Sequence, residues 1–167
     1  PQNPEIAQQL RQESQSAYTQ SAYIQSVAGC PVYCHTETSY FPLGDTAFPK
    51  MLEELRKAEK YIFLEYFIIG TGVMWDSILE ILKEKAAAGL DVRVMYDDFG
   101  CIMLLPAGYR KKLESYGIRC CVFGPFIPIA SARLNNRDHR KLMIIDGKVG
   151  FTGGINLADE YINARKK

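Results

Sequence analysis

Apolar residues recur along the chain in two alternating patterns, which predict helices and strands. Helical spacing of apolar side chains occurs at residues 45–60, 75–86 and 106–116. Short runs rich in β-branched and aromatic residues predict strands at 61–69, 90–96 and 118–123, followed by a hairpin at 141–152. This alternation predicts an α/β domain with a largely parallel (mixed) sheet flanked by helices on both faces.

Residues 1–28 differ from the rest because they are rich in Gln and Ser and carry few apolar side chains. This composition predicts a leader or linker segment with at most a weak helix. Residues 29–167 are long enough for a single domain with its own core. The chain begins without Met and stops soon after the hairpin, so we interpret it as a piece of a longer protein.

The composition is that of a globular protein, with 47% hydrophobic and 23% charged residues. The formal net charge of +1 provides no general basic field, which counts against nucleic acid as a partner. A local basic patch could still form from Arg133, Arg137, Arg140 and Lys141. The five cysteines follow no disulfide or zinc spacing, which favours reduced thiols in a cytosol-facing protein.

The hairpin carries the residues with the clearest chemistry. His139 and Lys141 are two positions apart, so on a strand they point to the same side. Such a pair suits a phosphate, since lysine supplies charge and histidine can attack phosphorus or move a proton. Gly153 and Gly154 allow close backbone approach to a ligand, and the Asn156 amide can donate to a phosphoryl oxygen. The alternative is a surface His and Lys on an ordinary hairpin.

Three acidic residues elsewhere also attract attention. Glu65 is the one charge in an otherwise apolar predicted strand, where a carboxylate is usually either paired or part of a site. Asp97 and Asp98 end the next strand and could form a metal pair or a strand-end turn. We favour the turn because neither a histidine nor a third acid stands nearby, and we predict no metal.

Two apolar loops, at residues 100–106 and 124–130, follow predicted strands. Both should lie at the carboxyl edge of the sheet, where α/β proteins bind ligands. Apolar loops in such a position indicate contact with acyl chains or a membrane surface. Alternatively, they fold back into the core.

The motif spacing closely matches that of a known superfamily. The motif consists of His139 and Lys141, then Asp146 after four residues, then Gly153-Gly154 after six more, and Asn156. This spacing resembles the HKD motif of the phospholipase D superfamily. More distant stretches resemble the N-terminal catalytic half of bacterial cardiolipin synthases of this superfamily. These stretches lie at residues 40–45, 63–68, 74–78, 92–98, 135–141 and 151–161.

The resemblance implies a phospholipase D-like domain that condenses two phosphatidylglycerol molecules into cardiolipin and glycerol, without a metal or other cofactor. By position, His139 would be the nucleophile or the general acid/base, while Lys141 and Asn156 would hold phosphoryl oxygens. Asp146 belongs to the motif but would support its strands rather than touch substrate. Because the relatives' Gly-Ser is Gly153-Gly154 here, backbone N–H groups would replace the hydroxyl.

Other acids are candidates for orienting the imidazole, as partners of site residues do elsewhere. Asp159 and Glu160 follow the motif, and Glu65 is a further candidate. The resemblance also implies a phosphatidyl-histidine intermediate, in which one histidine attacks phosphorus and a second moves the protons.

Family members contain two copies of this domain, whereas this chain has one motif. The expected partners are therefore phosphatidylglycerol or another anionic phospholipid, a membrane surface, and the C-terminal half of the same protein or a second copy. We expect the full-length protein at the cytoplasmic face of the cell membrane and this fragment to be soluble. The alternatives are a homodimeric phosphodiesterase (a nuclease or a phospholipase D) and an inactive lipid-binding half-domain.

Overall fold

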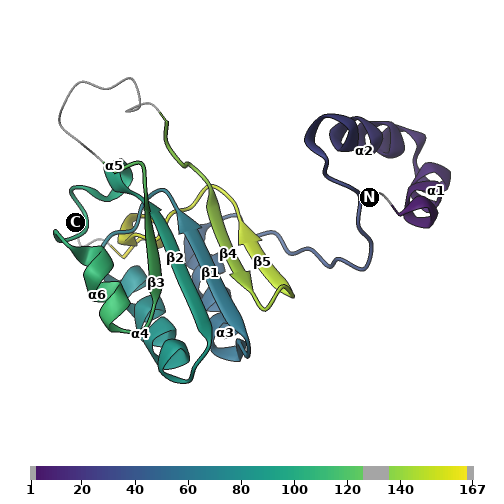
Figure 1. Cartoon of the computed structure of the whole chain (residues 1–167). Coiled ribbons are helices and arrows are strands. Elements are labelled where there is room, and N and C mark those ends of the chain that lie inside the picture. The colour runs from purple at the N-terminus through teal and green to yellow at the C-terminus, as the bar shows by residue number, and fades with distance from the viewer. Residues whose placement is uncertain (1–2, 126–135, 165–167) are drawn as a thin grey trace. The chain divides into compact units, whose positions relative to one another are not determined.

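The computed structural model describes residues 3–125 and 136–164 of the chain. The chain divides into two compact units, Pro1–Tyr40 and Phe41–Lys167 (Figure 1). The first unit contains helices α1 (Pro4–Glu13) and α2 (Gln15–Ala28), neither of which has a buried residue. The N-terminal segment is therefore more helical than its composition predicted.

The second unit is built on a five-stranded sheet with the order β3-β2-β1-β4-β5 (Figure 1). The strands are β1 (Tyr61–Tyr66), β2 (Asp91–Asp97), β3 (Arg119–Phe123), β4 (Lys141–Ile145) and β5 (Val149–Thr152). The first three are parallel, while β4 pairs antiparallel with β1 and β5 antiparallel with β4. This arrangement confirms the expected α/β class with a largely parallel, mixed sheet.

Among the described residues, five helical segments accompany the sheet. They are α3 (Gly44–Lys57), α4 (Val73–Ala87), α5 (Asp98–Cys101), α6 (Tyr109–Ser115) and the 3-10 helix η2 (Asp159–Ile162). Helices α3, α4 and α6 lie at or near predicted positions, whereas α5 and η2 were not predicted. Helix α6 begins later than predicted, because Gly108 before it adopts a left-handed φ of 74°. In the described part of the chain, no helix is both long enough and apolar enough to cross a bilayer.

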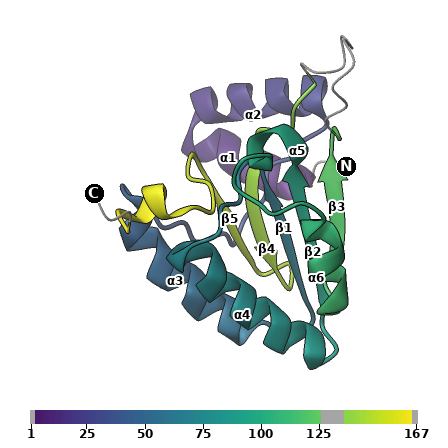
Figure 2. The ribbon, with the colours of Figure 1, turned by 90° about the vertical axis from the view of Figure 1, so that its left-hand side faces the viewer.

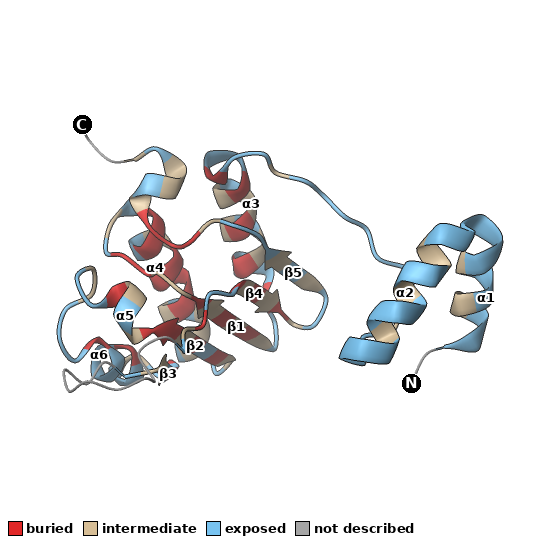
Figure 3. Cartoon of the chain, turned by 90° about the horizontal axis from the view of Figure 1, so that it is seen from above, coloured by how far each residue is buried: buried red, intermediate tan, exposed pale blue. Residues whose placement is uncertain are grey.

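Alternate side chains of the strands divide the sheet into a buried face and a half-exposed face (Figure 3). The buried face packs against α3, α4 and α6 and includes Ile62, Leu64, Val92, Val94, Met143 and Ile145. Trp75 of α4 is fully buried and donates a hydrogen bond to the hydroxyl of Tyr109 on α6 at 2.6 Å. This bond ties the two helices together on one side of the sheet.

The opposite face of the sheet is not covered by α3, α4 or α6. A shallow hollow of about 420 Å³ lies on it, lined by residues that include Phe63, Glu65, Met95, Leu142 and Ile144. Helices were expected on both faces, but these three helices lie on the same one. The period-two pattern of the strands does not reveal this difference, because it shows which side chains alternate and not what covers them.

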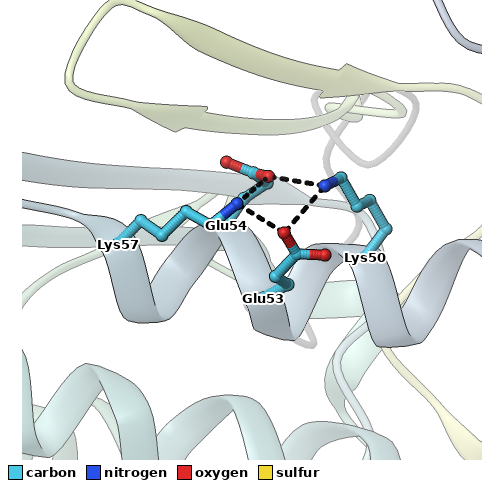
Figure 4. Close-up of polar contacts among 4 residues, drawn as sticks. All are labelled: Lys50, Glu53, Glu54 and Lys57. Carbon is cyan, nitrogen blue, oxygen red and sulfur yellow. Dashed lines mark hydrogen bonds and ion pairs between the residues drawn. The ribbon is translucent and has the colours of Figure 1, made fainter.

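The exposed side of α3 carries a network of ion pairs (Figure 4). Lys50 and Lys57 each pair with both Glu53 and Glu54. Hydrogen bonds from Lys57 and then Lys50 lower the pKa of Glu53 to about 2. Because these groups face solvent, the network adds little stability, and we interpret it as the outer surface of an amphipathic helix rather than a site.

Candidate active site

Two motif residues, His139 and Lys141, lie at the carboxyl edge of the parallel strands, where α/β sheets bind ligands. Lys141, the first residue of β4, pairs with Tyr66, the last residue of β1. The next residue, Phe67, lies against the ring of His139, with 4.8 Å between the ring centroids. The Lys141 ammonium lies 5.3 Å from the centroid of the same Phe67 ring. One aromatic side chain, which sequence reasoning did not single out, therefore brings His139 and Lys141 together.

Lys141 is a buried cation, with 5% of its surface exposed. Its ammonium donates a hydrogen bond to the backbone carbonyl of His139 at 2.6 Å. Burial lowers the pKa of Lys141, while the negative charge of Asp138 opposes that shift. His139 itself is exposed. An incoming anion would thus meet an accessible imidazole beside a desolvated positive charge, which acts more strongly than one in water.

Asn156 is held beside this pair by the segment that follows β1. It is 3% exposed, and its side-chain oxygen accepts a hydrogen bond from the backbone N–H of Ile68 at 3.0 Å. Its amide nitrogen donates to the hydroxyl of Tyr161 at 2.7 Å. An amide nitrogen carries two N–H groups, and Tyr161 takes one of them. Because Ile68 directly follows Phe67, the structure places His139, Lys141 and Asn156 around one short segment.

Gly153 and Gly154 are exposed and lead from β5 to Asn156. A Cβ atom added at either glycine would meet no atom within 4 Å. Neither glycine is therefore required for packing among the described residues. Their role in presenting backbone N–H groups to a phosphate stays a prediction.

Asp146 lies at the opposite end of β4 from Lys141, and the structure does not bring it to His139. Its carboxylate accepts hydrogen bonds from the backbone N–H groups of Glu59, Lys60 and Tyr61 at 2.9, 2.8 and 2.9 Å. Partial burial acts in the other direction, but these bonds lower the pKa of Asp146 overall. Asp146 was grouped with the catalytic residues, but its described contacts are with the backbone at the start of β1, and the supporting role that the resemblance implies stays a prediction.

Asp159 binds the start of α4 and does not orient the imidazole of His139. Its two carboxylate oxygens accept hydrogen bonds from the backbone N–H groups of Val73 and Met74, at 3.1 and 2.8 Å. It therefore caps the first turn of α4, where a negative charge is favourable. Glu160 is exposed on η2. The sequence could not reveal the capping, because Asp159 lies 86 and 85 residues from the two N–H groups that it binds.

Asp97 binds the segment that leads into β4. It is fully buried and accepts hydrogen bonds from the backbone N–H groups of Asp138 and Gly100, both at 3.1 Å. Arg137 pairs with the same carboxylate at 3.4 Å. These contacts support the strand-end turn rather than a metal pair at Asp97-Asp98, because the carboxylate of Asp97 already binds three donors of the protein.

Arg140 links two carboxyl groups on the open side of the sheet. It lies 2.6 Å from Glu65, as an ion pair without the alignment of a hydrogen bond, and donates to Asp138 at 3.0 Å. Burial, followed by the hydrogen bond with Asp138, raises the pKa of Glu65 to about 7. The side chains of Asp138 and Arg140 thus interact with Glu65, whereas those of His139 and Lys141 lie against the ring of Phe67.

These pairings largely neutralise the basic patch expected from the sequence. Arg137 is paired with Asp97, and Arg140 with Glu65 and Asp138. Arg133 lies outside the described residues. Among the described cations of this patch, Lys141 is the one whose charge is directed at His139 and Phe67.

The raised pKa of Glu65 gives a testable pH dependence of stability. A carboxyl group whose folded pKa exceeds its unfolded value contributes stability at low pH and loses it as the pH rises through the folded pKa. We expect the Tm of the unmodified chain to fall between about pH 5 and about pH 8 more steeply than that of Glu65→Gln. Thermal unfolding followed by circular dichroism measures both slopes.

The control for this experiment is Glu84→Gln, which changes an exposed glutamate on α4. Its melting temperature should follow that of the unmodified chain across the pH range. Parallel curves for Glu65→Gln and the unmodified chain would contradict the assignment.

Of the two predicted apolar loops, the structure describes the first. Ile102 and Met103 in that loop are exposed, at 46% and 89% of their surface, while Cys101 before them is buried. Leu104 is half-buried and lies near Gly70. The second predicted loop, at 124–130, lies almost entirely outside the described residues. The first loop thus divides into anchored residues and an exposed apolar tip.

Curated relatives match most of this chain. It is 49% identical over 158 residues, or 95% of its length, to an uncharacterized protein of Streptococcus mutans. It is 38% identical over 137 residues, or 81% of its length, to a cardiolipin synthase of Geobacillus kaustophilus. It covers 34% of the first protein and 27% of the second, so the chain spans about a third or less of these relatives.

Among solved structures, NucT from Helicobacter pylori has a TM-score of 0.54 over 71% of this chain and 72% of NucT, at 17% sequence identity. That likeness shows a shared fold. The family described as "Cardiolipin synthase, PLD-like domain" matches residues 51–166, which include the whole sheet and His139, Lys141 and Asn156. The chain therefore belongs to the phospholipase D-like domain family of cardiolipin synthases.

Proposed function

We propose that this chain supplies one of two half-sites of a phosphatidyltransferase that condenses two phosphatidylglycerol molecules into cardiolipin and glycerol. The observation that carries the proposal is the placement of His139 and Lys141 on Phe67, with Asn156 on the following residue. An accessible imidazole beside a buried ammonium and a carboxamide suits attack on a phosphodiester. Curated relatives that are named cardiolipin synthases support cardiolipin as the product, and phosphatidylglycerol is the substrate that the family resemblance implies.

The proposed reaction has two displacements at phosphorus. In the first, the His139 imidazole attacks phosphorus, the bond from phosphorus to glycerol breaks, and the glycerol oxygen takes a proton from a second imidazole. In the second, that imidazole removes a proton from the hydroxyl of another phosphatidylglycerol, whose oxygen attacks phosphorus. The phosphorus–nitrogen bond then breaks, which releases cardiolipin and restores His139.

Two imidazoles are required because the one bound to phosphorus cannot also move protons. Among the described residues, this sheet edge offers His139, and the other histidine of the chain, His35, belongs to the N-terminal unit. The second imidazole would come from another half of a longer protein or from a second copy of this chain.

Lys141 and Asn156 would stabilise the charge that builds on the phosphoryl oxygens. The ammonium already sits in a site where burial lowers its pKa, so an anion that reaches it gains a strong interaction. Its hydrogen bond to the His139 carbonyl fixes it next to the nucleophile before substrate arrives. Such preorganisation lowers the cost of reorganisation during the reaction.

The test is the dependence of product formation on chain concentration. If two copies complete the site, doubling the chain concentration should raise the initial rate of cardiolipin formation about fourfold while the dimer is mostly dissociated. Chromatography of the lipid products from phosphatidylglycerol vesicles measures this rate and separates cardiolipin from phosphatidic acid. Phosphatidylcholine vesicles are the control.

Phosphatidic acid as the main product would show water, rather than a second lipid, as the acceptor, and would replace transfer with hydrolysis. A rate strictly proportional to chain concentration, at concentrations where the chain is monomeric, would contradict completion of the site by a second copy. No turnover at any concentration would assign the second imidazole to another part of a longer protein.

A further inference from the structure

We propose that an apolar and basic surface at the site edge docks this domain on an anionic lipid bilayer. This docking surface consists of Phe99, Ile102 and Met103, together with Arg110, Lys111 and Lys112. The inference rests on the proposed function for its lipid substrate, but it concerns a different group of residues.

The apolar part of the docking surface is unusually exposed. Met103 is 89% exposed, Phe99 52% and Ile102 46%. These side chains lie within five consecutive residues, so they gather at one place rather than being scattered singly. Grouped exposed apolar side chains mark a surface that meets a partner or a membrane.

The exposed tip is anchored to the same segment that contacts His139. The Cys101 thiol lies between the backbone N–H of Ile69, at 3.2 Å, and the carbonyl of Phe67, at 3.6 Å. A Cβ atom added to Gly100 would lie 2.2 Å from the Phe67 carbonyl oxygen, so α5 packs tightly there. Figure 2 shows α5 at the end of the sheet where the parallel strands finish. A bilayer that binds to the docking surface would therefore have its lipid head groups near the sheet edge that carries His139 and Lys141.

The basic part of the docking surface lies across a hollow from the apolar part. Arg110, Lys111 and Lys112 are consecutive, exposed and in the first half of α6. Glu114 pairs with Arg110 at 2.7 Å, which leaves a surplus of positive charge on this helix. A hollow of about 330 Å³ lies between loop and helix, and its lining includes both Ile102 and Arg110. Ile102 from the apolar part and Arg110 from the basic part thus form walls of the same hollow.

An anionic bilayer fits both walls. Short apolar side chains enter the boundary between head groups and acyl chains, while neighbouring cations remain at the level of the phosphates. Each lysine or arginine near an anionic bilayer strengthens binding about fivefold at physiological salt. An apolar protein groove would take the three apolar side chains but would gain nothing from a row of three cations. The charge complementarity therefore favours the bilayer.

Vesicle flotation tests the docking surface. The unmodified chain should bind vesicles of equal parts phosphatidylglycerol and phosphatidylcholine, and added salt should weaken that binding. Met103→Asp should weaken it by about tenfold or more, because a carboxylate would enter the interface. The double variant Lys111→Glu with Lys112→Glu should weaken it by a similar factor or more.

The matched control is Leu43→Asp, which places the same charge on another exposed apolar residue, 57% exposed and just before α3. It should bind within about twofold of the unmodified chain. Equal binding by Met103→Asp and the unmodified chain would overturn the proposal. Equal binding to pure phosphatidylcholine vesicles would also overturn it, because the basic residues would then contribute nothing to docking.

A second measurement separates this inference from the proposed function. Turnover of short-chain phosphatidylglycerol below its critical micelle concentration does not require docking, so Met103→Asp should retain it. Vesicle binding without turnover of the soluble lipid would support the docking surface and would contradict completion of the site by a second copy of this chain. Turnover of the soluble lipid with unchanged vesicle binding in both docking variants would contradict the docking surface alone.

Discussion

Replacing His139 by alanine should reduce turnover of phosphatidylglycerol by about 10³-fold or more while leaving the fold intact. The side chain is exposed and its described contact is with the Phe67 ring, so its removal costs little packing. The backbone carbonyl that binds Lys141 remains in the variant, which keeps the ammonium in place. The loss should therefore fall on the chemical step. Product chromatography gives the rate, and circular dichroism with thermal unfolding checks the fold.

His35→Asn is the matched control, since His35 is the other histidine of the chain. Asparagine is suitable because His35 has a φ of 57°, a conformation that asparagine tolerates better than alanine. This variant should keep full turnover. Turnover by His139→Ala at the level of the unmodified chain would remove the basis of the whole site assignment.

Replacing Asp146 by alanine should instead lower the free energy of unfolding by about 3 kcal/mol. Three backbone N–H groups lose a charged acceptor, and alanine is strained at the φ of 55° that Asp146 adopts. Asp146→Asn should lose less, because it keeps one oxygen acceptor and asparagine accepts this φ. Denaturant unfolding at neutral pH measures all three proteins.

The control is Asp91→Ala, which removes a half-buried acid paired with Arg93 near the solvent-exposed start of β2. Its free energy of unfolding should change by less than about 1 kcal/mol. Per folded molecule, Asp146→Ala should keep its turnover within about threefold of the unmodified chain, because it lies at the far end of β4 from Lys141. Full stability combined with a large loss of turnover would assign Asp146 to catalysis instead.

Local periodicity was sufficient to predict the order of the elements, but not where each strand ends. The first strand was expected to reach residue 69, and it ends at Tyr66. Beyond that point the chain leaves the sheet so that Ile69 can bridge to Leu157 and Ile68 can bind Asn156. These partners lie 88 residues away, and the apolar run itself looks the same on both sides of Tyr66.

The site shows the same division between local pattern and distant contact. Spacing alone singled out His139, Lys141 and Asn156, which the structure brings to one edge. The tasks of Asp146 and Asp159 depend on backbone N–H groups 85 to 87 residues away, which no motif encodes. Phe67 was missed because an aromatic residue in an apolar run is ordinary core until its neighbours are known.

The alternation along residues 138–141 makes the length of this segment critical. His139 and Lys141 reach Phe67, while Asp138 and Arg140 reach Glu65. Because Lys141 is fixed opposite Tyr66 in the sheet, one residue inserted between His139 and Lys141 would shift His139 by one position and turn its imidazole away from Phe67. Natural variation in this family should therefore keep His139 and Lys141 and should not change the number of residues between Asp138 and Lys141. Grafted tags or loops should be placed elsewhere in the chain.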